Sequence, residues 1–134
     1  MTFLNRRDAA LTVTKACPAA GASVNTATID TGSAGDASLA NAVVEIAIPA
    51  LPSLAEGKTL TVKLQDSADN STYADVAELA SVVVTGAADA SGSAAATRTV
   101  RLPSGVRRYI QANLAVAGSG GDNTAQSVTV SLLG

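Results

Sequence analysis

The sequence predicts an all-β fold, a single jelly roll or β-sandwich of about seven or eight short antiparallel strands. Apolar and polar residues alternate with a period of two in several stretches, whereas a helical period persists nowhere for long. These stretches recur at a spacing of roughly 10 residues, and clusters of Gly, Ser, Asp and Asn separate them. We expect one domain over residues 1–134, with an N-terminal arm over about residues 1–10.

The first half of the chain holds four predicted strands. Residues 12–14 and 26–30 are short candidates near the N-terminus. In residues 43–48 and 60–65 every second residue is Val, Ile or Leu, so one face of each strand is apolar. Pro49 then ends the earlier of these two strands, because proline cannot continue a ladder of hydrogen bonds.

The second half holds four more predicted strands, over residues 82–85, 97–102, 106–116 and 127–132. The longest, 106–116, places Ile110, Ala112, Leu114 and Val116 inward and Tyr109, Gln111 and Asn113 outward. Residues 73–80 fit either a helix or a short turn. We expect turns at 66–72 and 118–123, and a long loop rather than a domain linker at 86–96.

The composition predicts a thin core. Hydrophobic residues make up 47% of the chain, but aromatic residues only 2%, with no Trp, two Tyr and one Phe. Because Ala supplies much of the hydrophobic fraction and buries little area, we expect modest stability for the isolated domain. Oligomerisation or docking on a partner would supplement that stability.

Charge and missing residue types exclude several function classes. Nine Lys and Arg against eleven Asp and Glu give a net charge of −2, so we expect no nucleic-acid partner. No stretch approaches the roughly 20 apolar residues that span a bilayer, and we expect no membrane partner. The lone Cys17 allows no intrachain disulfide, which fits synthesis in a reducing cytoplasm. With no His, Ser-His-Asp catalysis and His-ligated zinc are excluded.

Asp30-Thr31-Gly32 is the sharpest catalytic motif, because it resembles the aspartic-protease signature. That chemistry needs two carboxylates sharing one proton, so a chain with one motif works only as a homodimer. Other parts of the signature are missing, and a strand end with Asp30 capping a turn is the simpler interpretation. Asp66, Asp69 and Asn70 lack the spacing of an EF-hand calcium loop. We expect no catalytic residue, no cofactor and no metal, and hence no enzyme.

Two segments are candidates for partner contact. The N-terminal arm holds the single Phe of the chain, and an Arg-Arg-Tyr step opens the longest predicted strand. Arg and Tyr are enriched at the centres of interfaces. Edge protection by charge and a free N-terminal tail are the alternative interpretations. The candidate contact residues are Phe3, Leu4, Arg6, Arg7, Arg107, Arg108 and Tyr109.

Short motifs spread over most of the chain point to one family. They are Ile29-Asp30-Thr31-Gly32, Leu60-Thr-Val-Lys-Leu-Gln65 followed by Asp66-Ser67-Ala68-Asp69, then Tyr73, Leu102-Pro103 and Arg107-Arg108-Tyr109-Ile110. In these motifs the chain resembles phage capsid cement, or decoration, proteins of the Bordetella phage Bbp16 type. The resemblance implies a jelly roll on the outer surface of an icosahedral head, where it bridges major capsid subunits. It also implies a homo-oligomer, a dimer or trimer without catalytic residues, assembled in the host bacterial cytoplasm.

Two alternatives stay open beside a capsid structural protein. One is the homodimeric, retropepsin-like aspartic protease. The other is a tail- or fibre-associated binding module, for example for host glycans. The scarcity of aromatic residues argues against the glycan module, because sugar sites usually offer aromatic stacking faces.

Overall fold

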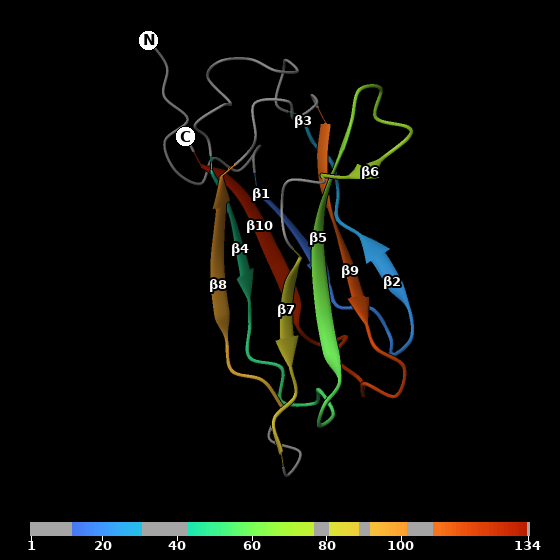
Figure 1. Ribbon diagram of the computed structural model, residues 1–134, viewed down its shortest axis with the longest axis vertical. Helices are drawn as coiled ribbons and strands as arrows, with labels where there is room; N and C mark the ends of the chain where they lie inside the picture. The colour runs from blue at the N-terminus through green and yellow to red at the C-terminus, as the bar shows by residue number, and fades with distance from the viewer. Residues whose placement is uncertain (1–11, 31–42, 77–80, 89–91, 102–108, 134) are drawn as a thin grey trace.

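The computed structural model describes residues 12–30, 43–76, 81–88, 92–101 and 109–133. Within these ranges the chain forms ten strands and no helix, in two sheets (Figure 1), which confirms the all-β prediction. The strands are β1 (Thr12–Ala16), β2 (Ser23–Asn25), β3 (Ile29–Asp30), β4 (Val43–Ile48), β5 (Thr59–Ser67), β6 (Ala74–Asp75), β7 (Val82–Thr85), β8 (Ala96–Arg101), β9 (Tyr109–Val116) and β10 (Ser127–Leu133). Among the described residues, no helix offers the length and hydropathy that crossing a membrane requires.

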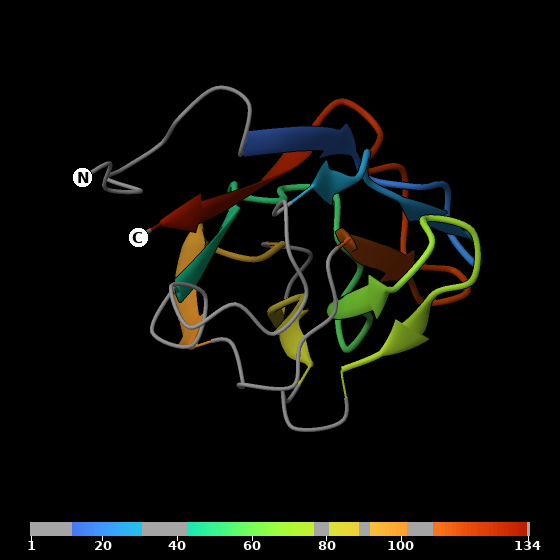
Figure 2. The ribbon, with the colours of Figure 1, turned by 90° about the horizontal axis from the view of Figure 1, so that it is seen from above.

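The two sheets lie on opposite sides of one interior (Figure 2). Sheet A has the strand order β1-β10-β4-β8, so strands from the two ends of the chain lie side by side. Sheet B has the order β2-β9-β5-β6, with β3 also paired to β9 and β7 also paired to β5. All of these pairs are antiparallel.

The outer rows of sheet B are each split into two short strands. β2 and β3 both pair with β9, at Ser23–Asn25 and Ile29–Asp30. β7 and β6 both pair with β5 on its other side. β2 and β6, of three and two residues, are too short for a clear alternation, which explains why the sequence predicted fewer strands than the ten observed.

Thr26 bridges the gap between β2 and β3. Its backbone N–H donates to the carbonyl oxygen of Ala112 at 2.9 Å, and its Oγ1 accepts the N–H of Ala112 at 3.0 Å. The same hydroxyl donates to the carbonyl of Ala27 at 2.9 Å. The Thr26 side chain, only 5% exposed, therefore supplies the acceptor that a regular strand would offer from its backbone.

We expect Thr26→Val to lower the free energy of unfolding by about 1 to 3 kcal/mol, because it leaves the buried N–H of Ala112 without its acceptor. Urea denaturation followed by circular dichroism measures the loss. Thr14→Val is the matched control, since the Thr14 hydroxyl bonds to Thr129 on an exposed surface and its removal should cost below about 0.5 kcal/mol. Equal losses for the two variants would contradict this role of Thr26.

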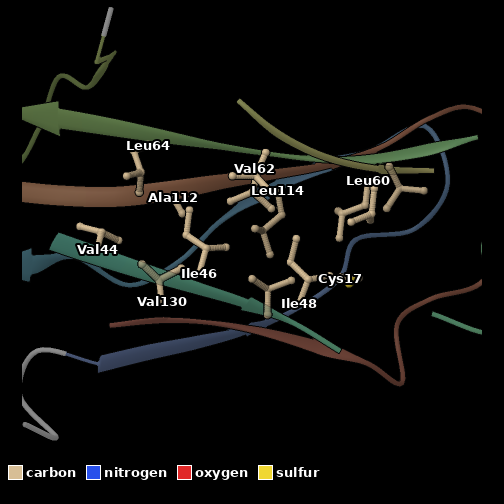
Figure 3. Packing of buried hydrophobic residues seen from close by; sticks show 14 of the residues in the cluster. Cys17, Val44, Ile46, Ile48, Leu60, Val62, Leu64, Ala112, Leu114 and Val130 are labelled. Carbon is tan, nitrogen blue, oxygen red and sulfur yellow. The ribbon is translucent and has the colours of Figure 1, made fainter. Parts of the chain in front are cut away.

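The core lies between the sheets and is aliphatic. Alternate residues of β4 and β10 meet those of β5 and β9, and their side chains point toward one another (Figure 3). The fully buried large side chains are all Ile, Leu or Val. Two of them, Leu51 and Leu54, come from the β4–β5 connection and are 0% and 1% exposed. This connection therefore covers the end of the core that lies at the bottom of Figure 1.

Three glycines let other connections pack directly on the β4–β5 connection. A Cβ on Gly86 would lie 2.1 Å from the carbonyl oxygen of Ala55, one on Gly92 would lie 2.2 Å from that of Leu51, and one on Gly121 would lie 2.1 Å from that of Ser53. Backbone hydrogen bonds accompany each approach, including the pair between Leu51 and Ser93 at 2.9 and 3.0 Å. We call this arrangement the glycine clasp.

The two edge strands of sheet A each carry a cation on the face that points toward the core. Lys15 in β1 lies opposite Val128, which is 0% exposed. Arg98 in β8 lies opposite Ile46, which is 1% exposed. Directly opposed residues share one face of a sheet, and both cations reach solvent at the open sides of the sandwich.

Several predicted boundaries need correction. The turn predicted at 66–72 begins later, because Asp66 and Ser67 continue β5 and are buried. Residues 74–75 form β6 rather than a helix or plain turn, since they pair with β5. The loop predicted at 86–96 contains a bridge between Ala87 and Gly92, and β8 begins at its last residue. The start of the predicted 106–116 strand lies outside the described residues.

Candidate interaction surface

Tyr109 is the one predicted contact residue that lies in the described part of the chain. It begins β9, is half-buried, and lies between Asp30 of β3 and Ser67 of β5. Its side chain therefore shares the outward face of sheet B with these two residues. The other candidates, Phe3, Leu4, Arg6, Arg7, Arg107 and Arg108, lie outside the described residues and stay predictions.

The outward face of sheet B carries a network of amide side chains. Gln111 Nε2 donates to Gln65 Oε1 at 2.8 Å, and Gln65 Nε2 donates to Asp75 Oδ1 at 3.0 Å, so one chain of bonds crosses β9, β5 and β6. In the next row Asn113 Nδ2 donates to Asn25 Oδ1 at 2.9 Å, across β9 and β2. Such cross-strand bonds hold the side chains in place.

Gln111 shows what the sequence missed on this face. Its outward orientation agrees with the prediction, because its neighbours Ile110 and Ala112 face the core. It is nevertheless only 8% exposed. Sequence alternation gives the side of the sheet and cannot give the cover that neighbouring side chains provide. The outward positions of the two longest strands, several of them amides, were the available signal for this surface.

A second polar cluster ties the β5–β6 hairpin to the segment before β3. Thr28 Oγ1 donates to Asn70 Oδ1 at 3.0 Å and lies 2.8 Å from the Tyr73 hydroxyl, which also donates to Asn70. Asn70 has a φ of 61°, a left-handed conformation that Asn tolerates. The cluster fixes the hairpin at the upper end of sheet B.

Asp69 organises the turn of this hairpin. Its Oδ1 accepts the N–H groups of Ser71 at 2.9 Å and Thr72 at 3.1 Å, and the Ser67 hydroxyl donates to it at 2.9 Å. These bonds, led by those from the backbone of Thr72 and Ser71, hold the pKa of Asp69 below its usual value. The bonds explain the Asp-Ser-Asn composition here without a calcium ion.

We expect the hairpin to loosen in acid. Because the folded pKa of Asp69 is lowered, its contribution is complete above the ordinary aspartate pKa of 3.8 and is lost as pH falls through the lower folded value. In NMR spectra the Ser71 and Thr72 amide shifts should titrate with a midpoint below 3.8. Asp69→Asn should abolish that titration. A midpoint at or above the ordinary value would contradict the assignment.

Two further groups, Cys17 and Asp122, have shifted pKa values. Burial raises the pKa of the Cys17 thiol. The backbone N–H of Cys17 donates to the carbonyl oxygen of Gln126. A buried thiol with a raised pKa is a packing residue. The hydroxyl and backbone N–H of Thr124 lower the pKa of Asp122 in the β9–β10 turn. In the part of the chain that the structure describes, no group of three or more His, Cys, Asp or Glu side chains could hold a metal ion.

Asp30 ends β3 and pairs with Tyr109 of β9. It also has an interaction within the chain. Thr31 and Gly32, the rest of the protease-like motif, lie outside the described residues. The structure therefore shows Asp30 paired within a sheet, and both interpretations of the motif, a turn-capping strand end and a protease, stay predictions.

No protein-family model matches the chain, and no curated protein matches its sequence. Among solved structures, the PBSX exported protein XepA is similar with a TM-score of 0.55 and 16% identity, over 99% of this chain and 39% of that chain. A CBM4 structure is similar with a TM-score of 0.41 and 15% identity, over 81% of this chain and 56% of that one. The structure of the infectious bursal disease virus VP2 subviral particle is similar with a TM-score of 0.45 and 10% identity, over 98% of this chain and 31% of that chain.

The chain thus spans less than two thirds of each of these three proteins. At 16% identity, the similarity to XepA extends over almost the whole chain and concerns the fold.

Proposed function

We propose that this protein is a structural capsid decoration, or cement, protein. It binds the outer surface of an icosahedral phage head and stabilises contacts between major capsid subunits. Its partners are the major capsid protein and further copies of itself, its place is the virion surface, and it is assembled in the host bacterial cytoplasm. The proposal assigns no catalytic residue and no cofactor to the chain.

The observation that supports this proposal most is the convergence of the family-like motifs on one end of sheet B. Ile29 and Asp30 lie opposite Ile110 and Tyr109. The same two residues of β9 lie opposite Asp66 and Ser67 of β5 on their other side. Motifs that are far apart in sequence thus form adjacent rows of three strands, which supports their belonging to one inherited structural unit.

A further motif residue joins the same end of the sheet. Tyr73 lies in the hairpin after β5 and contacts Thr28, immediately before β3. This arrangement suits a binding role, because a rigid sheet end presents polar side chains with little freedom left to lose. Repeated over a capsid lattice, many such modest contacts give an avidity that one small interface cannot.

Counting the protein in purified virions tests the proposal. Quantitative mass spectrometry of intact particles gives its copy number relative to the major capsid protein. A fixed ratio with many copies per head is the expected result, and heads assembled without the protein should break at lower internal pressure or temperature. Absence from the particle, or a few copies confined to tail fractions, would overturn the proposal.

A further inference from the structure

Lys63 and Asp75 form an exposed, long ion pair on the outward face of sheet B. Lys63 and Asp75 have side chains 47% and 57% exposed, and their nearest atoms, Nζ and Oδ2, are 4.0 Å apart. Asp75 accepts one further bond, from Gln65. An ammonium group has three donors and a carboxylate about four acceptor sites, so both groups have capacity for a second ionic partner.

We propose that a second copy of this chain docks on this face, with the two B sheets packed face to face across a two-fold axis. The inference rests on the proposed function, since it defines how copies of a decoration protein would pair. An axis lying in the interface, halfway between Lys63 and Asp75 and perpendicular to the line joining them, brings each lysine over the aspartate of the other copy. An ion pair such as Lys63 and Asp75 is self-complementary under that symmetry.

The lower part of the same face supplies the apolar contact. Val83 of β7 is 48% exposed, and among the described residues it is the one large hydrophobic side chain that is exposed. It lies in one cross-strand row with Thr61, Ala115 and Ser23. These small side chains lose little rotamer freedom when covered and leave room for the valine of a facing copy.

The amide network supplies order at the centre of the face. Hydrogen bonds of 2.8 to 3.0 Å already join Gln111 to Gln65, Gln65 to Asp75, and Asn113 to Asn25. Docking therefore immobilises few new side chains, which lowers the entropic cost of association. Amides both donate and accept, so the same groups on two facing copies can pair.

The outward face of sheet A is less suited to this pairing. Apart from Glu45 and the Val43–Arg101 pair at one end, its rows consist of hydroxyl and small side chains, such as Thr14 opposite Thr129. Its central acid, Glu45, is only partly exposed and already has an interaction within its own chain. The charged pair with spare capacity and the exposed valine both belong to sheet B.

The size of the face limits the area that a second copy can cover. Four strand rows and a longest strand of 9 residues span roughly 19 by 30 Å, on the order of 600 Å² per copy. Standard specific interfaces bury about 800 Å² per partner. We therefore expect a weak dimer whose population depends on concentration.

Sedimentation equilibrium of the purified full chain over a wide concentration range tests the inference. Lys63→Asp places acid over acid and should raise the dissociation constant at least about tenfold. The double variant Lys63→Asp with Asp75→Lys should return it to within about threefold of the original, because the pairing is restored with reversed polarity. Circular dichroism confirms that each variant is folded. Arg101→Asp, the same change of charge on the outward face of sheet A, should leave the dimer intact.

A chain that is monomeric at every concentration, or that forms a trimer, would overturn the inference. A dimer broken by Arg101→Asp and untouched by Lys63→Asp would overturn it as well. The measurement uses free protein, so it is independent of the virion copy number. A monomer found abundantly on heads would reject only the pairing, and a dimer absent from heads would reject only the capsid role.

Discussion

Replacing Gly121 with alanine should lower the free energy of unfolding by about 3 to 5 kcal/mol, because strain and overlap add. Gly121 has a φ of 90°, a conformation that L-residues rarely adopt. Its added Cβ would also lie 2.1 Å from the Ser53 carbonyl oxygen, which is backbone and cannot rotate away. The β9–β10 turn would have to move off the β4–β5 connection and uncover Leu54.

Two other glycines provide the controls for this prediction. A Cβ on Gly57, at a φ of 73°, meets nothing within 4 Å, so Gly57→Ala measures the cost of the backbone conformation alone. A Cβ on Gly118 also meets nothing, and its φ is not positive, so Gly118→Ala should be close to neutral. Chemical denaturation should rank the losses Gly121, Gly57, Gly118. A Gly121→Ala variant no less stable than Gly57→Ala would contradict the clasp.

Leu114→Ala should cost about 3 to 5 kcal/mol of unfolding free energy, through lost burial and the cavity left behind. Leu114 is 0% exposed and lies between Val24 of β2 and Val62 of β5. The surrounding core is aliphatic and its strands are tied into two ladders, so it cannot collapse far into the space.

Urea denaturation measures this loss, and Val24→Ala is its comparison. Val24 occupies the same row as Leu114 but is only partly buried, so its truncation should cost clearly less. A loss below about 1 kcal/mol for Leu114→Ala would show that the core repacks freely, contrary to the expectation.

The strands that sequence alternation located well are those with one buried and one polar face. β4 has the predicted bounds, β5 and β10 differ only at their ends, and β9 ends at Val116 as predicted. Their inward residues are buried as predicted, from Val44 in β4 to Leu132 in β10. A period of two, fixed by the pleat, is visible in such strands without any knowledge of their partners.

Pairing and closure were beyond the sequence pattern. Nothing in residues 12–14 indicates that β1 lies beside β10, since that contact joins residues more than a hundred positions apart, such as Thr12 and Ser131. Leu51 and Leu54 stand between prolines and glycines, where alternation is absent, yet they seal the core. Such features depend on how distant segments meet, which local propensity does not encode.

The candidate surface was predicted in part. Tyr109 lies on the outward sheet face that alternation predicted, and its role as a contact residue stays a prediction. Lys63 and Asp75 were not singled out, because two residues on different strands become neighbours only through the pairing of β5 with β6. Arg107 and Arg108 stay predictions.

Lys15 and Arg98 oppose the pairing of sheet A with strands of neighbouring molecules. A strand from a neighbouring molecule that extended sheet A would trap one of these cations between apolar surfaces, and burying an unpaired charge costs several kcal/mol. Growth of sheet A into a fibre by edge-to-edge pairing is therefore opposed at both of its edge strands. Edge strands protected in this way keep copies of sheet A from joining into one open-ended sheet.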